Sequence, residues 1–256
     1  MLRFPSSDWR PEQLRLTVFP MPGATARLLE WWESVTGSSP DETTSNPKKG
    51  SALVVGSFGS NKLVLRLEPD RIDWLFAPPA PELEGLPAEP QFPTIGPLVE
   101  ALGTFSGIAE SWLGRNDLPD VGRIAFGAVL THHEPDRRSG YLRLPDYVPV
   151  RIDPASSDFL YQINIPVASG TGIDGLQINR LSKWSVAALK YFAARFTGAA
   201  VAQHPVPEPV FALRLELDIN TSPGFEGPLP RGRLVEIYRE LVSLGSEIAA
   251  EGILPR

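Results

Sequence analysis

DFLYQINIPVASGTGIDGLQINRL, residues 158–181, is the stretch from which the architecture of this chain can be worked outward. The tripeptide Gln-Ile-Asn occurs in it twice, at 162–164 and at 177–179, and the segment between the copies is rich in glycine and other turn-forming residues. Alternating apolar and polar residues on both sides of such a turn are typical of an antiparallel hairpin. The stretch therefore predicts two paired strands.

Four carboxamides in this hairpin form a candidate ligand-binding face. Strands that pair symmetrically about the turn place Gln162 opposite Asn179 and Asn164 opposite Gln177. Because strand side chains alternate between faces, all four amides then share one face. Amides both donate and accept hydrogen bonds, so such a face could read a peptide backbone, a nucleobase edge or a sugar. The alternative is a structural ladder in which the amides bond to one another across the strands.

Other short strands and long amphipathic helices recur along the chain. Alternating patterns predict strands at residues 14–19, 51–58, 62–67, 71–77, 121–130, 141–144, 147–152 and 211–219. Apolar residues at steps of three and four predict helices at residues 24–35, 94–113, 184–198 and 231–251. This pattern is typical of an α+β protein in which antiparallel sheets built from hairpins are covered on one face by long amphipathic helices.

A proline-rich segment at residues 78–93 and the helix expected after it divide the chain. Each side of the division holds a group of strands and at least one long helix, which suggests two similar halves. We therefore expect α+β subdomains at residues 1–118 and 119–256, which can together form one compact unit. The sequence Leu-Arg-Leu-Glu, found at 65–68 and again at 213–216, is a slight sign of duplication.

Composition limits the class of function. The 256 residues include no cysteine, which excludes disulfides and thiolate chemistry and fits a reducing cytoplasm. The net charge of -6 argues against a general nucleic-acid-binding protein, which needs a basic surface. No apolar run reaches the ~20 residues of a membrane helix, and the first residues lack the apolar core of a secretory signal. We expect a cytoplasmic protein with no membrane attachment and no cofactor.

A charged stretch at residues 132–136 carries the chain's most versatile side chains. Its potential metal ligands are His132, His133, Glu134 and Asp136. Together with Asp158 and Asp218, they could serve a metal-dependent hydrolase or nuclease. Adjacent strand residues point to opposite faces, so the two histidines can share an ion only if the chain bends between them. The remaining histidine, His204, lies in a proline-flanked segment.

Two adjacent tryptophans, Trp31 and Trp32, lie in the short helix expected at residues 24–35. They give more aromatic surface than a short helix buries alone, and exposed aromatic residues are typical of protein interfaces. The pair therefore predicts contact with another protein or with a second copy of the chain. The alternative is a core helix whose indoles are buried between layers.

Three features of the second half carry a resemblance to a known family. They are the strand Arg-Ile-Ala-Phe-Gly at 123–127, the strand at 213–220 with its Asp-Ile-Asn end, and the C-terminal helix. In these features the chain resembles a sporadically distributed family of uncharacterised bacterial proteins, built from antiparallel strands with long covering helices. The resemblance covers roughly half the chain and implies the same α+β architecture. It brings no established activity, so no functional residue is carried over.

No complete catalytic set accompanies these features. We therefore expect a non-enzymatic bacterial binding or assembly protein that acts through contacts with another protein or with itself as a homo-oligomer. The metal-dependent hydrolase or nuclease described above is the alternative.

Overall fold

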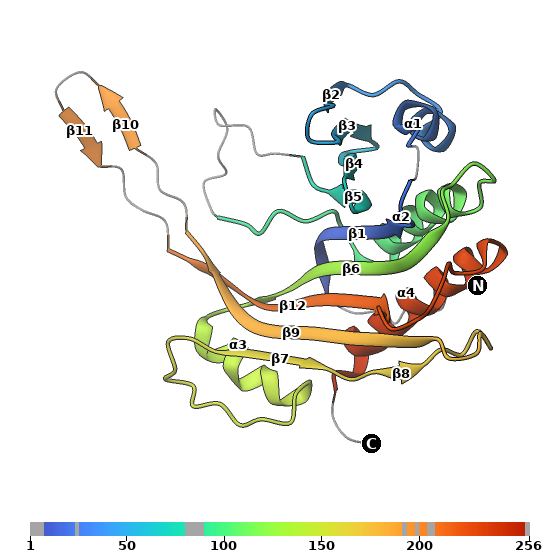
Figure 1. The fold of residues 1–256 in the computed structure, drawn as a ribbon. Coiled ribbons are helices and arrows are strands. Elements are labelled where there is room, and N and C mark those ends of the chain that lie inside the picture. The colour runs from blue at the N-terminus through green and yellow to red at the C-terminus, as the bar shows by residue number, and fades with distance from the viewer. Residues whose placement is uncertain are drawn as a thin grey trace.

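The computed structural model describes residues 8–23, 26–79, 90–190, 194–197, 200–203 and 208–253. Its main feature is an antiparallel sheet of ten strands in the order β2-β3-β4-β5-β1-β6-β12-β9-β7, with β8 also paired to β9 (Figure 1). Two further strands, β10 and β11, form a separate hairpin. The chain is therefore α+β with antiparallel strands, which confirms that part of the sequence prediction.

The bounds of the elements agree with many of the expected ranges. The strands are β1 (Arg10–Pro20), β2 (Glu42–Asn46), β3 (Ser51–Phe58), β4 (Asn61–Glu68), β5 (Arg71–Ala77), β6 (Val121–Glu134), β7 (Leu160–Asn164), β8 (Val167–Ala168), β9 (Gln177–Leu189), β10 (Ala194–Thr197), β11 (Ala200–Gln203) and β12 (Val210–Thr221). The helices are α1 (Leu28–Thr36), α2 (Leu98–Leu113), α3 (Arg137–Arg143) and α4 (Leu234–Glu251), with short 3-10 turns η2 (Leu144–Asp146) and η3 (Arg231–Arg233).

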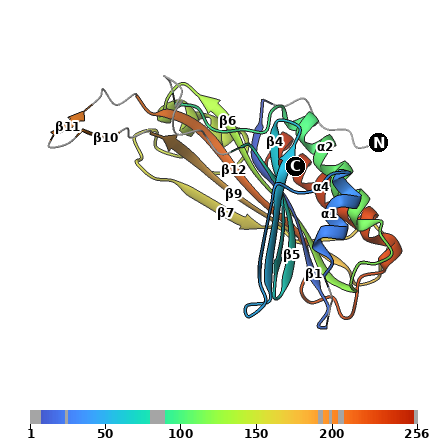
Figure 2. The ribbon, with the colours of Figure 1, turned by 90° about the horizontal axis from the view of Figure 1, so that it is seen from above.

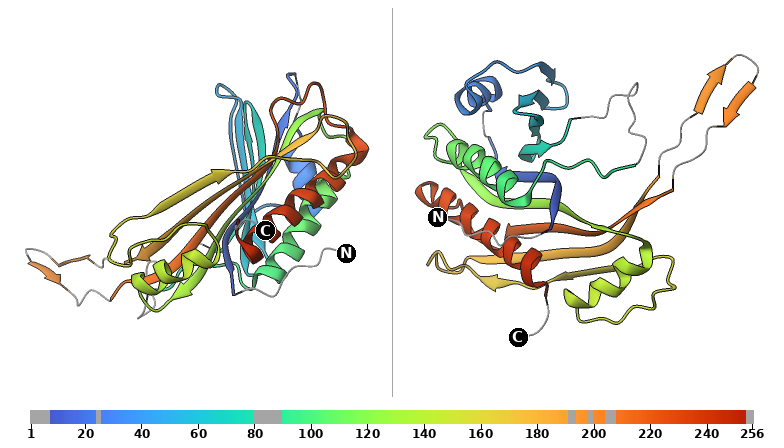
Figure 3. Two further views of the ribbon diagram at one scale, coloured as in Figure 1. Left: turned by 90° about the horizontal axis from the view of Figure 1, so that it is seen from below. Right: turned by 180° about the vertical axis from the view of Figure 1, so that it is seen from behind.

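The core lies between one face of the sheet and the helices. In Figure 2, α1, α2 and α4 lie on the same side of the strands, and the right-hand view of Figure 3 shows α2 and α4 in front of them. Alternate strand residues, such as Leu213, Leu215 and Ile219 of β12, are buried on this face. The residues between them, including Arg214 and Glu216, point to the opposite side, which we call the open face.

The prediction of a helix at residues 184–198 is wrong for the described part of this range, because residues 184–189 complete strand β9. Val186 and Leu189 have helical spacing, but Trp184 lies opposite Tyr161 of β7 and Leu215 of β12. Pairing on both edges satisfies the backbone of β9, and tertiary context then overrides a short helical pattern.

The prediction of strands at 141–144 and 147–152 is also wrong, since residues 137–146 form α3 and η2 and residues 147–152 form turns and irregular structure. The Asp136 carboxylate accepts a hydrogen bond from the Ser139 backbone N–H at 2.7 Å. An aspartate in this position caps a helix, and helix propensity then prevails over the apolar residues that read as a strand.

The expected boundary near residue 118 falls inside a continuous sheet, because β1 pairs with both β5 and β6. The division into two subdomains stays a prediction. The middle of the proline-rich segment 78–93 and His204 lie outside the described residues. Among the described helices, none combines the length and the apolar character that crossing a bilayer requires.

Candidate functional site

The four predicted amides share the open face, but β7 and β9 pair in a different register from the one expected. Gln162 lies opposite Lys183, and Asn164 lies opposite Leu181. The shift is by four positions, from residue 179 to residue 183, and an even shift leaves every side chain on its original face. The turn is therefore centred two residues later in the chain than expected, and the Ser169 N–H donates to the Leu176 carbonyl at 2.9 Å.

Three asparagines form a continuous line of hydrogen bonds across the open face, which we call the amide row. Asn164 Nδ2 donates to Asn179 Oδ1 at 3.0 Å, and Asn179 Nδ2 donates to Asn220 Oδ1 at 3.1 Å. Asn220 Oδ1 also accepts from Arg123 Nη2 at 3.3 Å, and Asn220 Nδ2 donates to Asp218 at 3.1 Å. The row links β7, β9, β12 and β6, so these asparagines form the structural ladder considered as an alternative.

The two glutamines of the repeated tripeptide behave differently. Gln162 and Gln177 are exposed, and neither side chain hydrogen-bonds to a residue in the described ranges. Their amides therefore remain available to a ligand, whereas those of Asn164 and Asn179 are occupied.

The main chain of β7 is a second exposed feature. The Ile165 N–H donates to the Arg180 carbonyl at 3.4 Å. This bond shows which residues of β7 direct their main-chain groups toward β9. In an antiparallel pair these residues alternate, so the main-chain groups of Leu160, Gln162 and Asn164 point away from β9. No other strand of the described chain pairs with β7 on that side. We call these three residues the β7 edge; all of them are exposed.

Four charged side chains on the open face neutralise one another. Arg214 Nη1 lies 3.1 Å from Glu12, Arg214 Nε lies 3.3 Å from Glu216, and Lys183 Nζ lies 3.2 Å from Glu216. Burial raises the pKa of Glu12 above its ordinary value of 4.5, and the neighbouring Arg214 offsets part of that rise. These pairs tie β1, β12 and β9 together and leave none of the four charges free.

A small pocket of about 240 Å³ lies beside this network, and we call it the central pocket. Arg15, Gly127 and Asp218 line it together with Lys183 and Glu216. Asp218 was one of the carboxylates expected to serve a hydrolase, and it is the only one of those side chains in this pocket.

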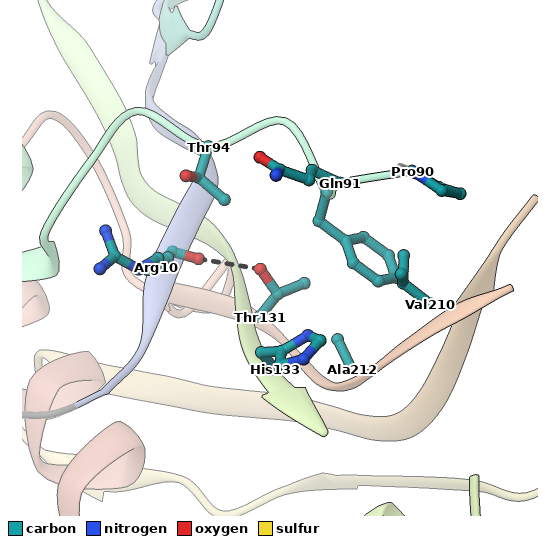
Figure 4. Close-up of a pocket in the computed structure, with 9 residues that line it drawn as sticks. Arg10, Pro90, Gln91, Thr94, Thr131, His133, Val210 and Ala212 are labelled. Atoms are coloured by element: carbon teal, nitrogen blue, oxygen red, sulfur yellow. Dashed lines mark hydrogen bonds between the residues drawn. The ribbon is translucent and has the colours of Figure 1, made fainter. Parts of the chain in front are cut away.

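A larger pocket of about 460 Å³ lies at one end of the open face (Figure 4). In Figure 4, Thr131, His133 and Ala212 lie opposite the segment that carries Gln91 and Thr94. The Thr131 hydroxyl donates to the Arg10 carbonyl at 3.2 Å and so fixes the wall on the β1 side. Two of the residues that line this pocket, His133 and Arg10, carry ionisable side chains.

The expected metal ligands do not form one site. His133 lies on the open face, whereas His132 and Glu134 lie on the helix-bearing face, where His132 Nδ1 is 3.0 Å from Glu134. Arg143 pairs with the same buried carboxylate at 2.5 Å, and Asp136 caps α3. No group of three potential metal-ligating side chains occurs among the residues that the structure describes.

Asp158, the remaining carboxylate of that proposal, is exposed next to β7 and accepts a hydrogen bond from the Ser157 hydroxyl at 3.4 Å. It lines neither of the two open-face pockets.

Trp31 and Trp32 are fully buried, so the structure corrects the expectation that they form an exposed interface. The Trp31 ring packs edge-on against Trp112 with centroids 5.5 Å apart, and Trp32 stacks on Trp74 at 5.9 Å. The helix is short, but α2 and the sheet cover both of its indoles, as the alternative reading required.

Sequence reasoning missed the β7 edge and the central pocket. Alternation in residues 211–219 placed Asp218 on a polar face, but only strand order brings β1 beside β6 and Arg15 beside Gly127. Comparisons with protein-family models, with curated proteins and with solved structures gave no match to this chain.

Proposed function

We propose that this chain is a non-enzymatic binding protein that captures an extended segment of another polypeptide as an additional strand beside β7. The observation that carries the proposal is the β7 edge, where three consecutive outward-pointing residues have no strand partner in the described chain. In strand addition, main-chain hydrogen bonds supply affinity, and side chains at alternate positions supply specificity.

The side chains of the β7 edge support this function. Leu160 is 59% exposed and offers apolar contact, while Gln162 offers a free amide beside it. Pro166 follows the edge and has no N–H, so it limits the length of an added strand. An edge this short favours reversible binding of a short segment over a permanent complex.

The arrangement of the layers is part of the same proposal. We infer that the long helices α2 and α4 act as the cover of one face, which leaves the open face and the β7 edge for partners. The lack of cysteine fits a reducing, cytoplasmic setting for such a protein, and the bacterial origin in the proposal rests on the family resemblance alone.

A proline at position 162 tests the proposal. Gln162→Pro removes one outward N–H, and it spares the ladder because that N–H does not bond to β9. The matched control is Gln162→Thr, which also removes the amide side chain but keeps the N–H and a good strand former. Random heptapeptides displayed on phage are selected on the purified chain, and their affinities for the three proteins are measured by calorimetry.

We expect selected peptides to bind the wild type and the threonine variant, with binding to the proline variant weakened about tenfold or more. Bound peptide should also slow hydrogen exchange of the Leu160, Gln162 and Asn164 amides. Peptides that bind all three proteins equally, without such protection, would show that the β7 edge is not the binding site.

A further inference from the structure

We propose that the central pocket binds a small zwitterion, a free amino acid or a dipeptide, between Arg15 and Asp218. This site is separate from the β7 edge, because β9 and β12 lie between β7 and the strand that carries Gly127. It can therefore exist whether or not a polypeptide adds to the sheet.

Strand register brings the two charged residues to the same level of the sheet. Arg15 of β1 lies opposite Gly127 of β6, and Gly127 lies opposite Asp218 of β12. Two strand spacings of about 4.8 Å therefore separate the Arg15 and Asp218 backbones. Gly127 has no side chain to fill the space between them.

The missing side chain at Gly127 leaves room for the Arg15 guanidinium. A Cβ built at Gly127 would lie 3.1 Å from Arg15 Nε and 3.2 Å from one terminal nitrogen. The guanidinium therefore folds across the glycine and forms one wall of the pocket, and a side chain at position 127 would push it away by at least a few tenths of an ångström.

Arg15 and Asp218 are the two uncompensated charges of this pocket. Arg15 makes no ion pair with a described residue, and its buried Nε has no hydrogen-bond acceptor there. Asp218 accepts one hydrogen bond, from the Asn220 amide, and has no cationic partner in the described ranges. Lys183 and Glu216, which also line the pocket, neutralise each other. Ten buried side-chain polar atoms of the described residues have no hydrogen-bond partner, and Arg15 Nε is the one of them that belongs to a residue lining this pocket. A ligand acceptor would satisfy it.

A ligand that carries both charges satisfies this arrangement. The guanidinium can hold a carboxylate through two parallel hydrogen bonds, and the Asp218 carboxylate can accept from an ammonium group. A simple anion on Arg15 would leave the Asp218 carboxylate without a partner, and a simple cation on Asp218 would leave the Arg15 guanidinium without one. The opposite charges on either side of Gly127 therefore select for a zwitterion.

Volume restricts the size of the ligand. Pockets for drug-sized molecules usually enclose about 300–1,000 Å³, whereas this one has about 240 Å³. An amino acid or a dipeptide suits that volume, and a nucleotide does not.

Titration of the isotope-labelled chain with glycylglycine, followed by amide chemical shifts, tests the inference. Acetate and methylammonium, each at matched ionic strength, are the single-charge probes. We expect glycylglycine to shift the amides of Gly127 and Asp218 with a Kd on the order of 1 mM. Each single-charge probe should bind about tenfold more weakly or worse, because it forms only one of the two charge-assisted interactions.

Three variants and one control identify the groups involved. Arg15→Gln and Asp218→Asn each remove one charge and should weaken glycylglycine about tenfold or more. Gly127→Ala keeps both charges but displaces the guanidinium, so it should weaken binding too. Arg66→Gln removes a cation from β4, outside the central pocket, and should leave affinity unchanged.

The inference is overturned if glycylglycine produces no shifts at these amides, or if acetate binds as tightly as glycylglycine. It is also overturned if Arg15→Gln and Asp218→Asn, with dispersed spectra that show native folding, bind as the wild type does. No variant of this set lies in β7, so a negative result with glycylglycine does not affect the proposal of strand addition at the β7 edge. A negative result in the peptide-binding experiment likewise does not affect the proposal for the central pocket.

Discussion

Asn179 is the residue on which the amide row depends. Its side chain accepts from Asn164 and donates to Asn220, so one amide joins three strands. Gln177 is on the same strand and the same face but has no such bonds. Two chemically similar amides of one repeated motif thus differ in what they do for stability.

Replacing Asn179 with alanine should lower the free energy of unfolding by about 1–2 kcal/mol, since two hydrogen bonds of about 0.5–1.5 kcal/mol each are lost and water replaces them in part. Urea denaturation monitored by tryptophan fluorescence measures the change. The matched variant is Gln177→Ala, for which we expect a change within about 0.5 kcal/mol. Equal losses in the two variants would mean that the amide row does not stabilise the sheet.

Glu12 gives the open face a pH dependence. Burial raises the pKa of its carboxyl above 4.5 in the folded chain, and Arg214 only partly offsets this effect. The folded state therefore binds more protons than the unfolded state between the two pKa values. Stability consequently falls as pH rises through this window, and the loss persists above the raised pKa.

Glu12→Gln should remove this loss of stability with rising pH. Urea unfolding at a series of pH values, from the ordinary pKa of 4.5 up to neutrality, measures the free energy of unfolding of both proteins. We expect the stability of the variant relative to the wild type to increase with pH. Glu42→Gln, which removes an equal charge from the exposed strand β2, should show no such trend. A constant difference between Glu12→Gln and wild type would contradict the prediction.

At the level of single residues, the sequence predicted on which face of the sheet a side chain lies, but not which residues that side chain contacts. Alternation correctly placed Gln162, Asn164, Gln177 and Asn179 together, because side-chain direction in a strand follows from position alone. The partner of each amide depends on register, which the loop and the Asn220 strand determine together. The sequence could not decide whether the two tryptophans are buried or exposed, since Trp31 packs on Trp112 of α2 and Trp32 on Trp74 of β5, both distant in sequence.

At the level of elements, local pattern succeeded where it agreed with the surroundings of the segment. α4 and β12 lie close to their expected ranges because a regular stripe or a clean alternation has only one structural solution. Residues 184–189 carried a weaker helical pattern, and strand pairing on both sides decided their conformation. Residues 137–143 show the reverse case, in which a capping aspartate begins a helix within residues that resemble a strand.

Helix α1 approaches β3 so closely that a glycine is required between them. A Cβ built at Gly56 would lie 2.6 Å from Trp32 Cζ2, far inside van der Waals contact. Because the indole is fully buried and stacked on Trp74, it has little freedom to move away. The packing of α1 on the sheet thus depends on position 56.

Gly56→Ala should therefore destabilise the protein by about 1–3 kcal/mol, the usual cost of overpacking. Gly107→Ala is the matched control, because that glycine is exposed on α2 with nothing near its Cβ position. Alanine is the better helix former, so the control should gain up to about 1 kcal/mol. Thermal and urea denaturation of both variants measure these changes. A neutral Gly56→Ala variant would show that α1 packs less closely than the structure indicates.

At the scale of the whole molecule, the order of strands differs from the order of the chain. β1 is the first strand in sequence but lies in the middle of the sheet, between β5 and β6. The indole of Trp9 donates to the Ala249 carbonyl of α4 at 2.8 Å, and Arg239 of α4 pairs with Glu110 of α2. Contacts therefore connect the two sides of residue 118 on both layers.

These connections predict that neither half of the chain folds alone. Fragment 1–118 would expose the β1 edge that pairs with β6, and fragment 119–256 would expose the matching edge of β6 together with the α4 surface that contacts Trp9. Unpaired edges and uncovered apolar surface favour aggregation. We expect each purified fragment to lack a cooperative unfolding transition in urea, whereas the full chain, prepared in the same way, unfolds cooperatively. A cooperative transition and a dispersed amide spectrum in either fragment would contradict the prediction. If both fragments behave in this way, residues 1–118 and 119–256 are independent domains, and the continuous sheet is a docked arrangement of two folded units.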